Sequence, residues 1–404
     1  MNPIAMPRAV LLGLAGLLAI FLGWRVLAAG EDALQRRKVL AGEISLGPAL
    51  GASGADAEWR QRFARNPAEG RALAMLALEL ERQGQREQAA VAMGDALRLS
   101  PADLGTLQEA ISFYLRTGDE AKALAALWHA AETVPVRYQF SRWDLLLAAL
   151  DSGRHRHFFD DIARRKSRVW PGFFKLACEG SGNVAALRAM FDARVKAGLG
   201  TAEERGCVID RLQRANLWSD AYVLWVNGLA PGERERIGLV FNGSFELPLS
   251  NRGFDWRMRA QEGVQVSTEF ADGSAERQVL HVAYASALFA GPPIHQSLLL
   301  TPGRYRFDAR ARLNLESWRG LQWALYCRDE AGRETGQLFA TDRLIGLSDW
   351  KKLHNEFSVP ANCPVQTLRL ELAPSRSEAN SAEEVRVRLK GDLWFDDLVA
   401  RKID

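Results

Sequence analysis

The sequence has few of the residues that mark metal and redox chemistry. Its 404 residues include 4 cysteines and 6 histidines, and no two cysteines stand in C-x-x-C spacing. Zinc-finger sites and thioredoxin-like redox chemistry are therefore unsupported. The sequence also has no motif for a glycine-rich phosphate loop, a nucleophile elbow or a Ser/His/Asp set. We therefore expect a protein that is not an enzyme and requires no cofactor.

The chain also lacks a strong excess of one charge. Lys plus Arg number 52 and Asp plus Glu number 49, which leaves a formal net charge of +3. Nucleic-acid binders usually carry a basic patch large enough to shift this balance, so we expect no nucleic-acid partner. The length is too great for one ordinary core, and two or three domains are expected from surface-to-volume scaling.

Charge is absent altogether from residues 9–24, and the apolar run continues beyond Arg25. About 22 residues of helix rise about 33 Å, which is enough to cross a hydrocarbon core of about 30 Å. We therefore predict a transmembrane signal anchor at residues 1–30 and a linker at residues 31–58. A cleaved signal peptide is the alternative, because Val26-Leu27-Ala28 offers small residues at suitable offsets.

The charges around this segment bear on its orientation. Arg25, Arg36, Arg37 and Lys38 follow the apolar run, and the positive-inside tendency would place them in the cytoplasm. The short N-terminus, with Arg8 as its charge, instead resembles an ordinary signal anchor whose N-terminus stays inside. We predict a single-pass inner-membrane protein of a Gram-negative-like bacterium, with most of the chain in the periplasm.

An internal repeat follows the linker. Pro67, Pro101 and Pro135 lie 34 residues apart. Small residues recur between them, at Ala77, Gly84, Ala89 and Ala96 in one unit and at Gly118, Ala123 and Ala130 in the next. Small side chains let two antiparallel helices approach, glycine turns the chain and proline ends the second helix. This pattern resembles the tetratricopeptide repeat (TPR).

The resemblance implies a solenoid of helical hairpins. One repeat cannot bury its apolar face alone, so we expect about four or five stacked helical pairs. We predict a TPR-like helical domain over residues 59–236. Solenoids present extended surfaces to other proteins, and the resemblance therefore implies a protein partner.

From residue 279 the apolar period changes from 3.6 to 2, as a half-buried sheet requires. In "GRYRFDARARL" the apolar residues Tyr305, Phe307, Ala309, Ala311 and Leu313 alternate with polar ones. Further alternating segments and turn signals between them suit an antiparallel jelly roll. We predict a β-sandwich over residues 237–404.

The ends of this region carry recognisable motifs. "NGSFE" and "GFDW" open it, "LTPGRYRF" and "DWKKLHNEFSVP" lie inside it and "GDLWFDDLVA" closes it. Together they resemble the carbohydrate-binding modules of the family 4/9/22 type, which are galactose-binding-like sandwiches. That resemblance implies glycan binding. It also implies a structural calcium ion at Glu246 with Asp396 or Asp397. The alternative is that these carboxylates accept backbone hydrogen bonds at strand ends.

Sugar recognition needs exposed aromatic faces with polar groups nearby. Trp256, Trp318 and Trp350 lie in or beside turns and are our candidates. Trp323 alternates with Leu321 and Leu325, and Trp394 directly precedes Phe395, so we assign both to the core. Positive charges alternate along one strand at Arg304, Arg306, Arg310 and Arg312. They indicate either a solvated outer face or a basic groove for an anionic polysaccharide.

The cysteines leave two possibilities open. If the body of the protein is exported, Cys327 and Cys363 can pair within the sandwich, because oxidising compartments let disulfides persist. Buried free thiols are the alternative.

The order of anchor, repeats and sandwich suggests a membrane-anchored periplasmic scaffold that binds a protein and a glycan. The resemblance places it in exopolysaccharide or O-antigen production. One alternative is a sandwich that only stabilises the chain or binds protein. Another is a glycan-active enzyme, which would need two carboxylates facing one cleft at about 5 to 10 Å. Glu262, Asp308 and Glu371 are available, but nothing in the sequence pairs them.

Overall fold

The computed structural model describes residues 55–66, 68–133, 142–271, 277–375 and 387–403. The chain divides into two compact units, Met1–Leu146 and Leu147–Asp404. The domain boundaries expected after residues 30, 58 and 236 remain predictions.

The described helices are too short to cross a bilayer. The longest have 14 residues, which rise about 21 Å against a hydrocarbon core of about 30 Å. Among the described residues no helix is long and apolar enough to span a membrane. This finding corrects the prediction of a single-pass inner-membrane protein. The predicted anchor at residues 1–30 lies outside the described residues, as does most of the linker.

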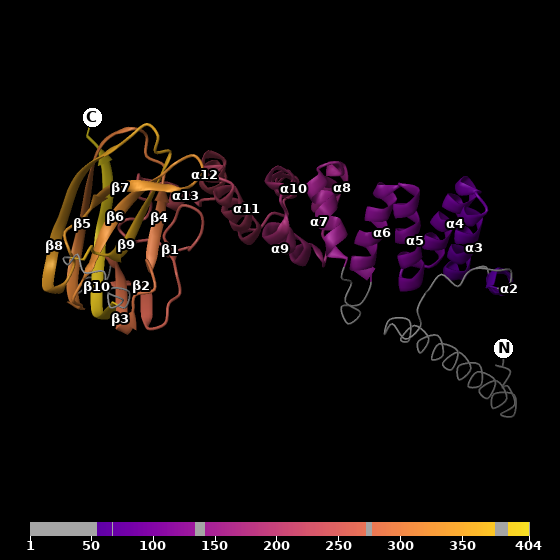
Figure 1. The fold of residues 1–404 in the computed structure, drawn as a ribbon, viewed down its shortest axis with the longest axis horizontal. Coiled ribbons are helices and arrows are strands. Elements are labelled where there is room, and N and C mark those ends of the chain that lie inside the picture. Colours follow the sequence, from indigo (N-terminus) through magenta and orange to yellow (C-terminus); the bar gives the residue numbers. More distant parts are fainter. Residues whose placement is uncertain (1–54, 67, 134–141, 272–276, 376–386, 404) are drawn as a thin grey trace, which may run out of the picture. The chain divides into compact units, whose positions relative to one another are not determined.

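The first unit contains helices that recur at a fixed spacing (Figure 1). They are α2 (Ala55–Arg65), α3 (Gly70–Arg82), α4 (Arg86–Leu99), α5 (Leu104–Thr117) and α6 (Glu120–Thr133). Helices α3 and α5 begin at residues 70 and 104, and α4 and α6 begin at 86 and 120, a spacing of 34 residues in both cases. Helix α3 packs on α4, and α5 packs on α6. The structure therefore has a helical hairpin that repeats with the period of the sequence.

Small residues hold these hairpins together. The predicted positions Ala77, Ala89, Ala96, Ala123 and Ala130 are completely buried. Gly84 and Gly118 have φ of +79°, a left-handed conformation that favours glycine, and each follows the first helix of its hairpin. Pro101 lies just after α4, where a helix must end. Pro135 lies outside the described residues.

Helix α7 (Trp143–Ser152) spans the boundary between the units. The second unit continues with α8 (Arg156–Ala163), α9 (Trp170–Gly180), α10 (Val184–Lys196), α11 (Ala202–Arg214), α12 (Trp218–Val226) and α13 (Pro231–Arg234). Trp170, Phe173, Phe174 and Phe191 form an aromatic core among α9 and α10. A disulfide from Cys178 to Cys207 joins α9 to α11.

Two antiparallel sheets complete the second unit (Figure 1). The strands are β1 (Arg257–Met258), β2 (Val264–Phe270), β3 (Gln278–Leu288), β4 (Ile294–Leu298), β5 (Gly303–Glu316), β6 (Leu321–Arg328), β7 (Glu334–Ala340), β8 (Gly346–Val359), β9 (Val365–Leu372) and β10 (Arg388–Lys402). The first sheet has the order β1-β4-β9-β6-β7, and the second has the order β2-β3-β10-β5-β8. The prediction of helices followed by a β-sandwich is confirmed at this level.

The core between the sheets follows the predicted alternation. Tyr305, Phe307 and Leu313 of β5 are buried. They pack in one cluster with Trp323 of the first sheet and Phe395 of β10. Because successive side chains of a strand point to opposite faces, the arginines of β5 must lie on the outer face of the second sheet.

The segment 242–256 contributes Phe245 and Trp256 to this core. Asn242 makes two side-chain hydrogen bonds to the main chain of Leu247, at 2.9 and 3.0 Å. The amide of Leu398 donates to the carbonyl of Gly243 at 2.9 Å, and a Cβ at Gly243 would overlap the carbonyl of Leu398. Glycine is therefore required where the opening segment approaches the closing strand.

Candidate functional site

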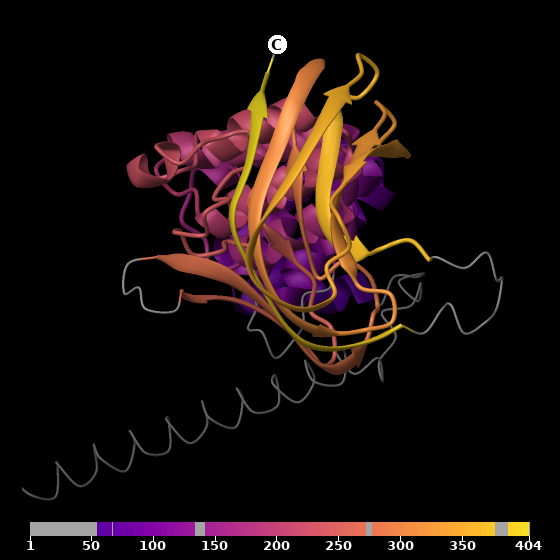
Figure 2. The same cartoon turned by 90° about the vertical axis from the view of Figure 1, so that its left-hand side faces the viewer.

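The outer face of the second sheet carries the most distinctive group of side chains in the sandwich. This sheet faces the viewer in Figure 2. On its central strands, Arg312 of β5 lies opposite Trp394 of β10, and Trp394 lies opposite His281 of β3. Register therefore brings three residues far apart in the sequence into one line across three strands.

Arginine guanidinium groups and aromatic rings lie against one another along this line and beside it. The guanidinium carbon of Arg312 lies 4.0 Å from the centroid of Trp394 and 5.9 Å from that of Trp350. Arg310 lies 5.1 Å from the Trp350 centroid. Trp394 and His281 stack with centroids 5.1 Å apart and an interplanar angle of 4°. We call Trp350, Arg310, Arg312, Trp394 and His281 the cation–aromatic row.

Carboxylates fix one end of the row. The indole N–H of Trp394 donates to Glu269 Oε1 at 2.5 Å. His281 Nδ1 lies 3.1 Å from Glu269 Oε2, and His281 Nε2 lies 2.8 Å from Asp392 Oδ1. Both ring nitrogens thus have a carboxylate partner, and the imidazole has one fixed orientation. The row is therefore ordered by hydrogen bonds as well as by stacking.

The remaining charges on this face are partly paired. Arg304 lies 3.3 Å from Glu356, and His354 lies 2.8 Å from Asp308. Arg310 lies 3.9 Å from Asp397, which is a long contact for an ion pair. Arg306 Nε is buried and has no hydrogen-bond partner among the described residues.

The row can bind an anion at its guanidinium edges. Stacking uses the faces of a guanidinium group, whereas its N–H donors lie in the plane of the group and point along its edges. Such donors match the two oxygens of a carboxylate or a sulfate. Half-buried indole rings beside them add apolar surface for a sugar ring.

The predicted tryptophan candidates have different environments. Trp256 is completely buried, and its Nε1 donates to the carbonyl of Asn242 at 3.1 Å. Its ring packs against Phe245 and Trp323 in the core. The assignment of Trp256 to glycan contact is therefore wrong. Trp318 is 55% exposed in the turn between β5 and β6. Trp350 lies in β8 and belongs to the row.

Trp394 was missed by the sequence reasoning, which assigned it to the core. Its neighbours Leu393 and Phe395 are both completely buried, so period 2 turns Trp394 outward, where it is half-buried. Alternation around Trp394 was therefore the signal that could have found it. Trp323 is a core residue, as its own alternation with Leu321 and Leu325 indicates.

The predicted calcium ligands have a cation of the chain itself. Arg277 forms ion pairs with both Asp396 and Asp397. Burial raises the pKa of the Asp396 carboxyl, and the nearby charge of Asp397 raises it further. Glu246 accepts a hydrogen bond from the amide of Gln278 at 3.3 Å. Among the described residues no three His, Cys, Asp or Glu side chains form a metal-binding group, and the structural calcium ion stays a prediction.

The cysteines form two disulfides. Cys327 of β6 is bonded to Cys363, the pair that the sequence suggested, with Cα atoms 5.4 Å apart. The bond from Cys178 to Cys207 was not expected. Sequence reasoning missed it because its two cysteines belong to different helices, whose packing only the fold provides.

The outer face of the first sheet holds a second polar cluster. Arg369 lies 2.7 Å from both Glu334 and Glu371, and its guanidinium stacks on Tyr326 at 3.8 Å. The Tyr326 hydroxyl donates to Glu371 at 2.7 Å. Burial, and then this carboxylate, raise the pKa of Tyr326 to about 12. These groups satisfy one another, so the cluster has few donors left for a ligand.

Part of the chain is similar to solved structures. The chain matches no known family profile and no curated protein. Among solved structures it is similar to the enzymatically active domain of tailspike protein 4 of bacteriophage CBA120, at 12% identity and a TM-score of 0.31. That match covers 41% of this chain and 22% of the tailspike domain.

Two carbohydrate-binding modules are also similar. One is a CBM4, at 15% identity and a TM-score of 0.29, with 41% of this chain and 99% of that chain covered. The other is a CBM22-1 xylan-binding domain from Paenibacillus barcinonensis, at 16% identity and a TM-score of 0.28, with 40% and 92% covered. At these scores the similarities do not decide a function.

Proposed function

We propose that the sandwich binds an acidic glycan along the cation–aromatic row and that the protein is a binding protein, not an enzyme. The observation that carries this proposal is the position of the Arg312 guanidinium group between the rings of Trp350 and Trp394. A uronate carboxylate or a sulfate ester is the ligand group that fits such a fixed donor.

The proposal explains why arginine and tryptophan occur together on this face. An ordinary solvated face would need only charge, whereas the row adds large apolar rings. Pyranose rings present C–H groups that pack on aromatic surface, and their acidic substituents would reach the guanidinium edges. A polymer running across the strands would meet these groups in succession.

The arrangement of carboxylates supports a binding role. Asp308 lies on the outer face of the second sheet and is paired with His354. Glu371 belongs to β9 of the first sheet and is paired with Arg369. Because these two candidates belong to different sheets, they face no common cleft of the kind that glycoside hydrolysis needs.

The test is a binding series on the full chain. Calorimetry with polygalacturonate, a polymer of uronic acid, is expected to give saturable binding that weakens with salt, because exposed ion pairs are screened. Neutral xylan at the same mass concentration is the control and is expected to bind at least ten-fold more weakly. Equal affinity for both polymers would refute acidic specificity. No binding of either would favour a sandwich that only stabilises the chain or binds protein.

A second candidate function is protein binding by the helices. We infer that the hairpins repeated every 34 residues form a TPR-like solenoid, because small residues occupy their contacts. In the second unit a groove of about 440 Å³ runs along α10 and is favourable for a peptide. Its rim alternates in charge, with Arg156, Arg164, Arg188 and Lys196 against Asp160, Asp192 and Asp220.

In-cell photocrosslinking tests this second function. A photoreactive residue at Ala189, which lines the groove, is expected to crosslink a discrete protein. The same residue at Val91, which is 66% exposed on α4, is the control and is expected to give no such product. Equal patterns at both positions would count against the groove. A role in exopolysaccharide or O-antigen production would follow only if such a polymer proves to be the ligand.

A further inference from the structure

A hollow of about 290 Å³ lies beside β4 within the second unit. Its lining comes from α12, from the segment after α13 and from β4. Tyr222, Trp225, Phe241 and Phe254 line it on one side, and residues 296–299 line it on the other. Four consecutive residues of β4 and its end, 296–299, belong to this set. Successive side chains of a strand point to opposite faces of the sheet. A hollow that four consecutive residues line therefore runs along the main chain of the strand.

The main chain of β4 is unpaired along this hollow. The amide of Arg259 donates to the carbonyl of Pro293 at 2.9 Å, and Arg257 lies opposite His295. In an antiparallel sheet, successive residues of a strand direct their N–H and C=O groups alternately to the neighbouring strand on one side and on the other. Ser297 and Leu299 therefore point these groups to the same side as Pro293 and His295, the side of β1. Strand β1 begins at Arg257, however, so that none of its residues lies opposite Ser297 or Leu299. In the described part of the chain nothing pairs with Ser297 or Leu299 on that side.

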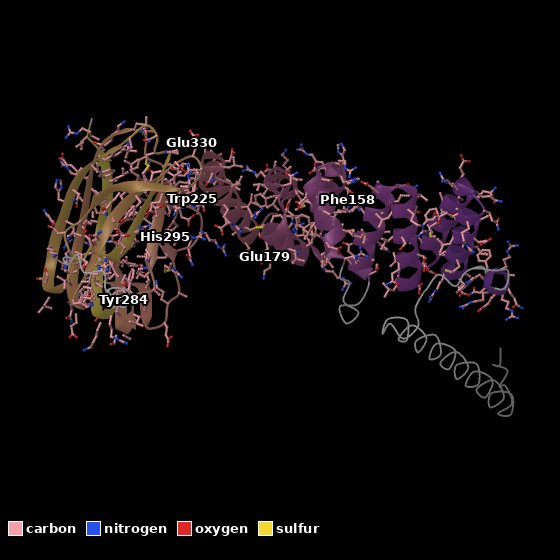
Figure 3. The ribbon with its side chains drawn as sticks, viewed as in Figure 1. Phe158, Glu179, Trp225, Tyr284, His295 and Glu330 are labelled. Atoms are coloured by element: carbon pink, nitrogen blue, oxygen red, sulfur yellow. A yellow bond between two sulfur atoms is a disulfide. The ribbon has the colours of Figure 1, made fainter. Side chains whose placement is uncertain are left out.

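Aromatic rings form the opposite wall of the hollow. Trp225 of α12, which is labelled in Figure 3, lies 5.6 Å from Tyr222 and 5.7 Å from Phe254 between centroids. Trp225 also makes an edge contact with Phe241 at 4.8 Å. Burial raises the pKa of the Tyr222 hydroxyl. Leu239, another lining residue, is 39% exposed.

We propose that an extended segment of a partner protein adds a strand to β4 at Ser297 and Leu299 and places one bulky apolar side chain in the hollow. An unpaired strand edge is a template for such addition, with main-chain hydrogen bonds for affinity and a pocket for specificity. The added strand continues the β1–β4 ladder past the pair of Arg257 and His295, at the residue where β1 begins. This site is separate from the cation–aromatic row and does not depend on the proposed glycan binding.

The dimensions favour a single side chain over a larger ligand. Pockets for drug-sized molecules hold about 300 to 1,000 Å³, and this hollow is at the lower limit of that range. Its wall of four aromatic rings has few groups for the many hydroxyls of an oligosaccharide. A leucine, phenylalanine or tryptophan flanked by extended main chain matches both the rings and the open edge.

The probe for this site is a random peptide library displayed on phage and selected on the full-length protein. The selected peptides are expected to share one bulky apolar residue flanked by β-branched residues. A scan of N-methylated forms of the best peptide then tests strand addition without altering the protein. Methylation is expected to weaken binding at least ten-fold at every second position and to have little effect between them, because alternate amides face β4. Uniform or absent effects would overturn the proposal.

Two variants locate the site. Ser297→Pro removes one main-chain amide. Strand β9 does not use this amide, because the N–H and C=O groups that face β9 belong to Gln296 and Leu298. Proline is tolerated at such a position, where the N–H points away from the sheet. Ser297→Pro is expected to reduce peptide binding at least ten-fold, whereas Ser297→Ala, which keeps the amide, is expected to bind like the parent. Tyr222→Ala is expected to weaken binding through the hollow. Full binding by both Ser297→Pro and Tyr222→Ala, in protein with unchanged thermal unfolding, would refute the site.

Discussion

The guanidinium carbon of Arg312 lies 4.0 Å from the ring centroid of Trp394, and on the other side of that ring lies His281, stacked at 5.1 Å. The three residues come from β5, β10 and β3, which are neighbours in that sheet but are far apart in the sequence. Strand register places the three side chains next to one another, and the guanidinium group of Arg312 lies against the rings of Trp394 and Trp350. This arrangement makes the row testable by conservative substitutions.

The first prediction concerns the shape of the Arg312 side chain. Arg312→Lys keeps the charge but loses the planar fork and the stacking on Trp394. Its affinity for polygalacturonate is expected to fall about ten-fold, which corresponds to about 1.4 kcal/mol. The matched control is Arg304→Lys on the same strand, where the side chain is exposed and pairs with Glu356. Calorimetry that finds equal losses in the two variants would assign the binding to charge alone.

The second prediction concerns His295 on β4. Burial, and then the charges of Arg257, Arg328 and Arg369, lower the pKa of His295 to about 4. In the unfolded chain the imidazole has a pKa of about 6.5 and takes up a proton first. Stability is therefore complete above pH 6.5 and is lost as pH falls toward 4, by about 2 kcal/mol between pH 7.5 and pH 5. Urea unfolding at both pH values measures this loss.

The variant His295→Asn is the control for that prediction. Without the imidazole, the difference in unfolding free energy between the two pH values is expected to shrink by about 2 kcal/mol. An unchanged difference would show that other groups, such as the carboxyls of the sandwich, cause the pH dependence.

The third prediction concerns Gly391 of β10. Its φ is +115°, and a Cβ there would overlap the carbonyl of Asn314 on the paired strand. Gly391→Ala is expected to lower the free energy of unfolding by roughly 2 to 4 kcal/mol, because both the backbone and the contact are incompatible with a side chain. A Cβ at Gly336 on β7 would meet no atom within 4 Å, and Gly336→Ala is expected to change the free energy of unfolding little. Similar melting temperatures for the two variants would contradict this account.

The fourth prediction concerns the disulfide between Cys178 and Cys207. The bond joins residues 29 apart in the sequence. Closing a loop of about 30 residues removes enough entropy from the unfolded chain to stabilise the fold by about 3 to 4 kcal/mol. Replacing both cysteines with alanine is expected to lower the unfolding free energy by this amount in denaturant titrations. Titration of two free thiols in the native protein, with Cys327 and Cys363 still bonded, would refute the pairing.

The two halves of the chain differ in how far sequence reasoning could go. The 34-residue period and the recurring small residues were sufficient to predict the helical hairpins, because a small side chain such as that of Ala89 lets two helices approach closely. Alternation was sufficient for β5, since each apolar residue there faces the core. Trp256 and Trp394 were assigned to the wrong environments. Position in a turn does not reveal burial, and the neighbours of Trp394 decided which face it occupies.

The sequence by itself determined the order of helix and strand, the 34-residue period and the inward face of each alternating strand, because these depend on contacts between nearby residues. Only the tertiary structure decided that Arg312 meets Trp394, that Arg277 neutralises Asp396, and that β4 keeps an open edge beyond β1. Those relationships depend on register and on the approach of distant segments, which local patterns of polarity do not encode.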